Sequence, residues 1–263
     1  MTADLQPDAP RPRRIDVAAA TVGDVRAALA DGWRDFLRRP LLSAFFGLVC
    51  ALSGVALIAG PVLFGQIWIA IAASVAFPLV APFLAAGLYE MSRRLKRHEP
   101  FTATDILLVV FDQRKRELGW MAFVVLFVFW MWAYNVRLLL ALFLQHQALL
   151  SPPDLAAVIF TTADGALFLV VGAAVGSAIA SVLFTLTVIS MPLLLDKDVD
   201  FITAIIASGQ AVFKSPFVML GWGAVIGAMT LAAVAPAFAG VIVVFPILGH
   251  ASWHLYERLV SER

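Results

Sequence analysis

The chain has 263 residues, of which 62% are hydrophobic and 14% are charged, whereas an average soluble domain has roughly 45–50% and about 25%. A water-soluble core cannot use this excess of apolar residues, and a net charge of +1 provides no basic surface for nucleic acid. The composition excludes an ordinary soluble domain and predicts an all-α, polytopic membrane helical bundle.

The N-terminal segment differs from the rest of the chain. Residues 1–20 are rich in Pro, Arg and Asp and lack apolar periodicity, which predicts a disordered cytoplasmic tail before a single transmembrane domain over residues 21–260. Residues 1–39 lack the apolar core of a cleavable signal peptide, so the first span is expected to act as its own insertion signal.

Short amphipathic segments precede several of the apolar stretches. From Thr21 to about residue 39, apolar residues recur at helical spacing and charges occupy the other faces, which predicts a helix on the membrane surface. Similar segments are expected at residues 104–111, with Thr104 as N-cap, and at residues 200–214.

Long stretches without Asp, Glu, Lys or Arg predict the membrane spans. About 20 residues cross the roughly 30 Å hydrocarbon layer, and residues 40–89 and 215–256 are long enough to cross twice, with turns at Gly60-Pro61 and Pro236. The segment over residues 165–195 is long enough that it must tilt, kink or leave the bilayer. The six predicted spans are residues 41–59, 62–89, 118–144, 165–195, 217–235 and 237–255.

The distribution of basic residues predicts the topology. Of the 19 Lys and Arg residues, all except Arg137 lie in the N-terminal segment, the loops over residues 90–117 and 196–214, or the C-terminal segment. Basic loops face the cytoplasm, so we expect a multi-pass protein of the bacterial inner (plasma) membrane with both termini cytoplasmic.

Arg137 is the one formal charge within a predicted span. It lies about one membrane thickness from Leu118, where it can reach the outer interface and act as an anchor, with Asp164 as a candidate partner. The alternative is a functional intramembrane charge that contacts a lipid or a solute.

His250 and His254 are four residues apart and share a helical face, and Glu90 is expected near the same interface. These three residues are candidate metal ligands, but histidines at span ends are also ordinary interface residues. No metal, cofactor or catalytic motif occurs in the sequence, and Cys50 is a lone cysteine in an apolar run, so no catalytic, cofactor-binding or metal site is expected.

Small residues at four-residue spacing recur in two of the predicted spans. Gly172, Gly176 and Ala180 form one row and Gly223 and Gly227 another, which favours close helix packing. The alternative is a narrow path with hydroxyl-bearing residues along it, which are Ser177, Ser181, Thr185, Thr187 and Ser190.

The sequence also contains an internal repeat. Pro40 follows Asp24 by the same number of positions as Pro216 follows Asp200. Leu88-Tyr89-Glu90 has the same sequence as Leu255-Tyr256-Glu257, near the end of each unit. The expected units are residues 24–95, 102–196 and 200–259, the middle one degenerate.

Three segments carry a resemblance: Gly32-Trp33-Arg34-Asp35-Phe36 with Pro40, Gly87-Leu88-Tyr89-Glu90, and Phe245 to His254. The chain resembles, from about residue 20 onward, an uncharacterised family (a domain of unknown function) of predicted bacterial integral membrane proteins, sometimes labelled cytochrome c oxidase subunit I. A heme-copper subunit needs more spans and more membrane histidines than the four in this chain. The resemblance implies fold, membrane residence and a proteobacterial source, and it supplies no catalytic residues.

Three classes of function remain open at this point. The leading hypothesis is a non-enzymatic assembly, organising or envelope-homeostasis factor whose candidate partners are membrane lipids and other membrane protein complexes, with no nucleic acid. The alternative is a channel or transporter subunit for a small solute or lipid, although the spans lack the paired acidic groups of coupled transport. An enzyme with an interfacial site built from His250, His254 and Glu90 is the third.

Overall fold

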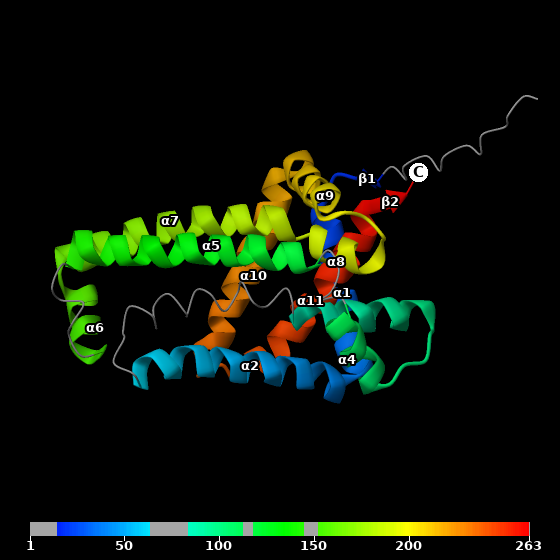
Figure 1. The fold of residues 1–263 in the computed structure, drawn as a ribbon, viewed down its shortest axis with the longest axis horizontal. Helices are drawn as coiled ribbons and strands as arrows, with labels where there is room; N and C mark the ends of the chain where they lie inside the picture. The colour runs from blue at the N-terminus through cyan, green and yellow to red at the C-terminus, as the bar shows by residue number, and fades with distance from the viewer. Residues whose placement is uncertain (1–14, 64–83, 113–117, 145–151, 263) are drawn as a thin grey trace, which may run out of the picture.

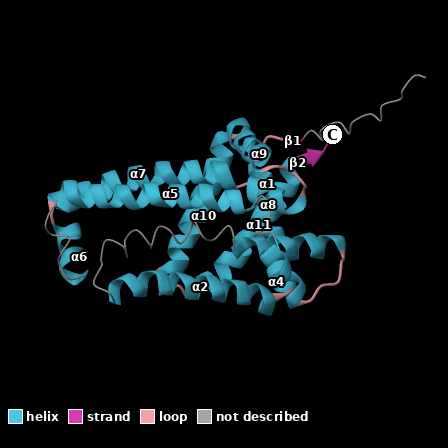
Figure 2. Ribbon diagram, in the orientation of Figure 1, coloured by secondary structure: helices cyan, strands magenta, loops and turns pink. Residues whose placement is uncertain are grey.

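The computed structural model describes residues 15–63, 84–112, 118–144 and 152–262, which are nearly all helical (Figures 1 and 2). Residues 84–97 are helical and are called the 84–97 helix. The other elements are β1 (Ile15–Val17), α1 (Val22–Arg38), α2 (Pro40–Leu63), α4 (Ala103–Asp112), α5 (Leu118–Leu139), a π-helix (Leu140–Leu144), α6 (Pro152–Thr161), α7 (Ala163–Thr187), α8 (Ser190–Asp196), α9 (Phe201–Lys214), α10 (Pro216–Val234), α11 (Val241–Leu259) and β2 (Val260–Glu262).

Within the described residues, three helices are long and apolar enough to cross a membrane: Phe123–Leu144, Ala163–Asp196 and Pro216–Val234. The number becomes four if α1 and α2, bent by 105° at Arg39, count as one broken span. The all-α membrane fold is confirmed, whereas the count of six spans is not. Most of the second predicted span falls on residues 64–83, outside the described part, and the polar second half of α11 keeps that helix out of the set.

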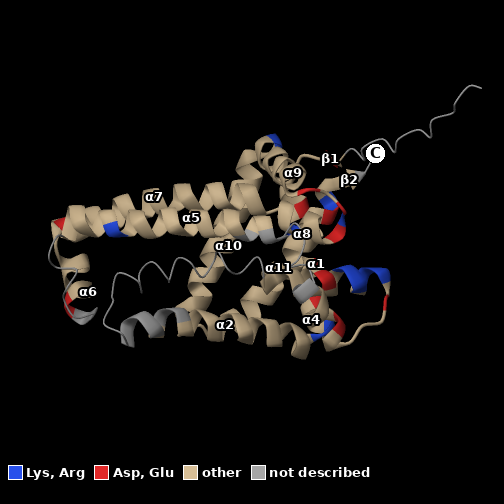
Figure 3. Ribbon diagram, in the orientation of Figure 1, with Lys and Arg blue, Asp and Glu red and all other residues tan. Residues whose placement is uncertain are grey.

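Charged residues gather at one end of the molecule. Figure 3 shows them around α1, the 84–97 helix, α4, α8 and α9, while the long apolar helices α5 and α7 extend away from this end. Arg137 occupies the last turn of α5, and Asp154 and Asp164 begin α6 and α7 at the opposite end. The structure therefore has one strongly charged end and one sparsely charged end, as the predicted topology requires.

Two surface helices turn into apolar helices through the same local geometry. Thr21 caps α1 in a capping box with Asp24, and α1 ends at Arg39, whose φ and ψ are −139° and 59°. Asp200 caps α9, which ends at Ser215 with φ and ψ of −147° and 63°. Pro40 and Pro216 then open α2 and α10, because proline fits the first turn of a helix but cannot continue one.

These paired breaks agree with the expected alignment of Pro40 and Pro216, although the N-cap Thr21 lies farther from its proline than Asp200 does. The repeat units over residues 24–95, 102–196 and 200–259 stay a prediction. In the middle unit the cap of α4 is Thr102, not Thr104, because Thr102 and Asp105 bond each other's side chains and backbone N–H groups.

Residues 15–20 correct part of the prediction of a disordered tail over residues 1–20, of which residues 1–14 lie outside the described residues. Ile15–Val17 forms β1, which pairs antiparallel with β2 and joins the two ends of the described chain. Val17 is 1% exposed, and Lys214 Nζ donates to its carbonyl oxygen over 2.5 Å. A short apolar segment can be ordered in this way by partners that lie far away in the sequence, which local composition does not reveal.

The sequence predicted two tight turns and a tilt or kink in one long segment. The prediction of a turn at Gly60-Pro61 is wrong, because α2 continues to Leu63. The turn at Pro236 is confirmed, and Ala237 and Phe238 adopt positive φ there. The long segment over residues 165–195 breaks between α7 and α8, next to Pro192, as its length required.

Helix α11 is the centre of the packing and lies against both α1 and α2 (Figure 1). Gly32 of α1 and Gly47 of α2 allow these close contacts because glycine has no Cβ. A Cβ on Gly32 would lie 2.6 Å from the backbone nitrogen of Ala251, and one on Gly47 would overlap the backbone of Ile242. The two glycines fix where α1 and α2 cross α11, and so which side chains meet.

Candidate functional site

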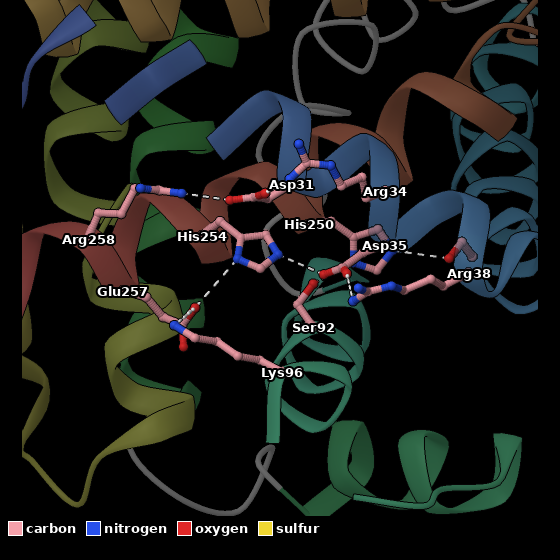
Figure 4. A network of polar contacts seen from close by, with 11 residues as sticks. Asp31, Arg34, Asp35, Arg38, Ser92, Lys96, His250, His254, Glu257 and Arg258 are labelled. Carbon is pink, nitrogen blue, oxygen red and sulfur yellow. Dashed lines mark hydrogen bonds and ion pairs between the residues drawn. The ribbon is translucent and has the colours of Figure 1, made fainter. Parts of the chain in front are cut away.

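The crossing of α1 and α11 brings two ionisable side chains together. One turn beyond Gly32 lies Asp35, and one turn beyond Ala251 lies His254. The Nε2 atom of His254 is 2.7 Å from Oδ2 of Asp35, and the Asp35 residue is 3% exposed (Figure 4). The backbone contact at Gly32 therefore positions a nearly buried histidine–carboxylate pair.

The electrostatics of this pair favour its charged form. His254 lies in the last turns of α11, outside the segments that qualify as spans. Burial alone would lower its pKa, but the hydrogen bonds and charges of Asp35 and Glu257 raise the pKa of His254 to about 9. Burial alone would raise the pKa of Asp35, yet hydrogen bonds from His254 and Ser92 and the charge of His254 lower it. The pair is an imidazolium and a carboxylate at neutral pH.

His250, one turn earlier on α11, is fully buried and has different partners. Its Nε2 atom lies 3.0 Å from the Ser43 hydroxyl of α2, and its Nδ1 atom lies 2.7 Å from the Ser92 hydroxyl of the 84–97 helix. A neutral imidazole offers one donor and one acceptor, which two hydroxyls can satisfy. His250 therefore joins three helices through a closed set of hydrogen bonds.

Glu90 is 1% exposed and is neutralised within its own helix. The guanidinium of Arg93 donates to both carboxylate oxygens over 2.7 Å, and Nε of Arg94 donates to Oε1 over 2.5 Å. Burial would raise the pKa of Glu90, but these two arginines lower it. A carboxylate held by two guanidiniums has its lone pairs occupied by N–H donors rather than available to a metal.

A cleft of about 330 Å³ opens beside the Asp35–His254 pair, and its lining is entirely ionisable. Arg258 pairs with Asp31 and Lys96 pairs with Glu257 between helices, while Arg34 and Arg38 pair with Asp31 and Asp35 within α1. We call it the ionic cleft, and Figure 4 shows how α1, α11 and the 84–97 helix contribute to it. Its lining residues are Asp31, Arg34, Asp35, Arg38, Lys96, His254, Glu257 and Arg258.

A second, larger cavity of about 530 Å³ lies among α7, α10, α11 and the 84–97 helix. Gly176, Ala180, Gly223 and Gly227 line it, so the small-residue rows leave space as well as allowing packing. Gly176 and Gly223 do pack, against the rings of Trp132 and Phe184, whereas a Cβ on Gly227 would meet nothing within 4 Å. We call this space the apolar cavity.

Four of the five hydroxyl groups considered for a polar path are bonded within α7 and α8, and the fifth, Ser177, lines the apolar cavity. Ser181, Thr185 and Thr187 each donate to the carbonyl oxygen four residues earlier, over 2.7–2.8 Å. Ser190 donates in the same way to Leu186. Because each hydroxyl has one proton to donate, none of these four donates into the cavity.

The candidate metal residues do not converge. His250 bonds Ser43 and Ser92, His254 bonds Asp35, and Glu90 bonds Arg93 and Arg94. Within the described residues, no group of three or more His, Cys, Asp or Glu could hold a metal ion. His250, one of the two histidines expected at a span end, is completely buried within the protein.

Arg137 is exposed in the last turn of α5. It does not line the apolar cavity or the ionic cleft. Sequence reasoning gave this residue most weight and missed Asp35, Ser43 and Ser92. A signal was present, since residues 32–36, 87–90 and 245–254, which carried the family resemblance, come together where α1, α11 and the 84–97 helix pack.

A comparison with protein families adds one match. Residues 69–196, slightly less than half of the chain, match the family described as predicted integral membrane protein (DUF2189). No curated protein and no solved structure matches the chain. Most residues of the ionic cleft lie outside the matched segment, so the family description does not assign them a role. The match confirms the family that the sequence resembles: over residues 69–196 the chain is similar to the predicted integral membrane proteins of the DUF2189 family.

Proposed function

We propose that the protein is a non-enzymatic membrane protein that holds the acyl chain of a membrane lipid and acts as an assembly, organising or envelope-homeostasis factor. The apolar cavity is the observation that carries this proposal. Its volume of about 530 Å³ falls in the range of roughly 300–1,000 Å³ that small-molecule sites occupy. Its walls combine glycines, alanines and large apolar side chains, which suit a flexible hydrocarbon chain.

The placement of charge supports residence in a bacterial inner membrane with both termini in the cytoplasm. The charged end holds α1, the 84–97 helix and α9, and basic residues favour the cytoplasmic side. The sparsely charged end, with α6, would then face the periplasm.

The alternative is a channel or transporter subunit. Four Ser and Thr hydroxyls on α7 and α8 donate to carbonyl oxygens four residues earlier, which makes a polar solute a less suitable substrate. A lipid substrate would use the same apolar cavity, so a transporter of lipid differs from a lipid-holding factor only in whether the bound chain crosses the membrane.

The proposal is tested by photo-crosslinking the purified full chain in nanodiscs with a phospholipid that carries a diazirine on its acyl chain. We expect labelled peptides from α7 around Gly176 and from α10 around Gly227. Gly227→Leu should reduce this labelling at least threefold, because Gly227 lines the cavity and a Cβ there has open space for the larger side chain to extend from.

Gly221→Leu is the matched control. Gly221 is exposed on the same helix, also has open space for a Cβ, and does not line the cavity, so labelling should be unchanged. Equal labelling of wild type and Gly227→Leu would refute the proposal. Transfer of a fluorescent lipid between leaflets of protein-containing vesicles, abolished by Gly227→Leu, would establish the transporter instead.

A further inference from the structure

The ionic cleft is separate from the apolar cavity, since the two share no lining residue. Its charges are arranged in two layers. The outer side chains are cationic and their side-chain exposures are 66% for Arg34, 58% for Arg38, 59% for Lys96 and 37% for Arg258. The inner side chains are carboxylates, with 4% for Asp35, 25% for Asp31 and 21% for Glu257. A ligand that enters the cleft therefore meets cations first.

The balance of charge also favours an anion. The four outer cations and protonated His254 outnumber the three carboxylates of the cleft, so the lining carries an excess of positive charge. The carboxylate oxygens of Asp31 and Asp35 already accept bonds from Arg34, Arg38, His254 and Arg258, and Glu257 forms an ion pair with Lys96. A further cation would have to compete with these cations for the carboxylates.

Hydrogen-bond donors remain for such a ligand. Each guanidinium has five N–H donors, and the bonds to Asp31 and Asp35 take one from each of Arg34, Arg38 and Arg258. Arginine forks match the geometry of phosphate oxygens, and Lys96 adds a point charge on the opposite wall. A volume of about 330 Å³ leaves room for a tetrahedral anion and ordered water.

We propose that the ionic cleft is a binding site for a phosphoryl anion, supplied either by the headgroup of an acidic phospholipid or by free phosphate. The cleft lies at the charged end of the molecule, beside the amphipathic helix α1, whose Trp33 and Leu37 are exposed. Headgroup phosphates lie at the depth of such interfacial helices. The anion bridges α1 and the 84–97 helix through Arg34 and Lys96.

The test measures binding to the purified full chain in a neutral detergent. The probes are inorganic phosphate and dihexanoyl phosphatidic acid, each titrated at constant ionic strength with chloride as the balancing anion. Binding is followed as a rise in melting temperature, read from tryptophan fluorescence. Dihexanoyl phosphatidylcholine, at equal concentration, controls for a general effect of lipid.

Four substitutions test the location of the site. Arg34→Gln and Lys96→Gln should each raise Kd about tenfold, as expected for loss of one charge-assisted hydrogen bond. Arg26→Gln removes an exposed arginine of the same helix that does not line the cleft, and it should leave Kd unchanged. Asp31→Asn removes an inner negative charge and should lower Kd several-fold, an effect that damage to the fold would not produce.

The outcomes separate the sources of the anion. Binding of phosphatidic acid alone assigns the site to a lipid headgroup, and competition by inorganic phosphate assigns it to the phosphoryl group itself. Absence of stabilisation by both probes at millimolar concentration overturns the proposal. An equal loss in Arg26→Gln overturns it as well, because binding would then follow overall charge. None of these results depends on acyl-chain labelling in the apolar cavity.

Discussion

Asp35 and His254 stabilise the fold only while both are charged. The unfolded-state pKa of histidine is about 6.5 and the folded-state pKa of His254 is about 9, so its contribution is complete below pH 6.5 and is lost as pH rises through 9. The pKa of Asp35 is lowered, so its contribution is complete above its ordinary value near 4 and is lost on acidification. The pair therefore stabilises between these two limits.

His254→Gln should lower the stability of the full chain by roughly 2–3 kcal/mol at pH 6, since it removes the closer of two cations, His254 and Arg38, that contact the buried Asp35. The difference in melting temperature between wild type and this variant should shrink between pH 7 and 10. Thermal unfolding in detergent across this range measures it. A difference that is constant with pH would contradict a protonated His254.

A second prediction at the residue scale concerns Gly32, where α1 crosses α11. Gly32→Ala places a Cβ against the backbone of Ala251, so α1 must move from α11, at an expected cost of about 1–3 kcal/mol. Gly221→Ala has open space and gains helix propensity, so it should be neutral or stabilising. Melting temperatures of the two variants, compared with wild type, check this contrast. Equal stability of Gly32→Ala and wild type would show that this helix crossing is not tightly constrained.

At the scale of single residues, the sequence identifies a charge that is unusual for its segment, but it does not identify a charge that becomes buried in the fold. Arg137 stood out as the one charge in a predicted span, yet it is exposed. Asp35 looked like one of several charges on an amphipathic helix, and it is nearly buried. Burial of Asp35 depends on Gly32 and Ala251, which lie far apart in the sequence, so no local pattern could identify it.

At the scale of elements, proline and cap chemistry were readable because they act locally. Thr21 and Asp200 precede helices, and Pro40 and Pro216 begin new ones, as predicted. The strand pair β1–β2 was not readable, since each strand has three residues and its partner lies at the other end of the chain. The turn expected at Gly60-Pro61 failed because α2 runs through that site.

The strand pair gives a prediction of its own. Val17→Asp places a carboxylate among buried apolar side chains. Because burying an unpaired charge is unfavourable, β1 should detach from β2. Hydrogen exchange at residues 15–20 should then accelerate at least tenfold, whereas Ser261→Ala, at an exposed position of β2, should leave it unchanged. Rapid exchange of residues 15–20 already in wild type would contradict the ordered strand.

For the whole molecule, the asymmetry of charge predicts orientation in the membrane. In a Cys50→Ser background, a cysteine at exposed Thr161 should react with an impermeant maleimide in whole cells, and one at exposed Glu99 should not. Both should react after permeabilisation, which controls for accessibility. Labelling at Glu99 but not at Thr161 would reverse the topology.

The fold class was predictable at this scale because apolar composition is a property of the whole chain. The number of spans was less predictable, because hydropathy cannot distinguish a lipid-facing helix from one enclosed by protein. In the Pro216–Val234 span, 17% of the residues in the apolar window are buried, whereas much of α11 is enclosed by α1, α2 and the 84–97 helix. Its two histidines are tolerated because protein, rather than lipid, surrounds them.

The central place of α11 has a consequence for biogenesis. Among the described long helices, α11, against which α1 and α2 pack, leaves the ribosome last. Before α11 is synthesised, Asp35, Ser43 and Gly47 lack the contacts that they make with it in the folded protein. Until then α1 and α2 cannot adopt their final packing. Packing of α1 and α2 therefore depends on synthesis of the chain through residue 259 and does not proceed helix by helix. A nascent chain stalled before residue 241 should be a substrate for membrane quality control, and one that extends past residue 259 should escape it.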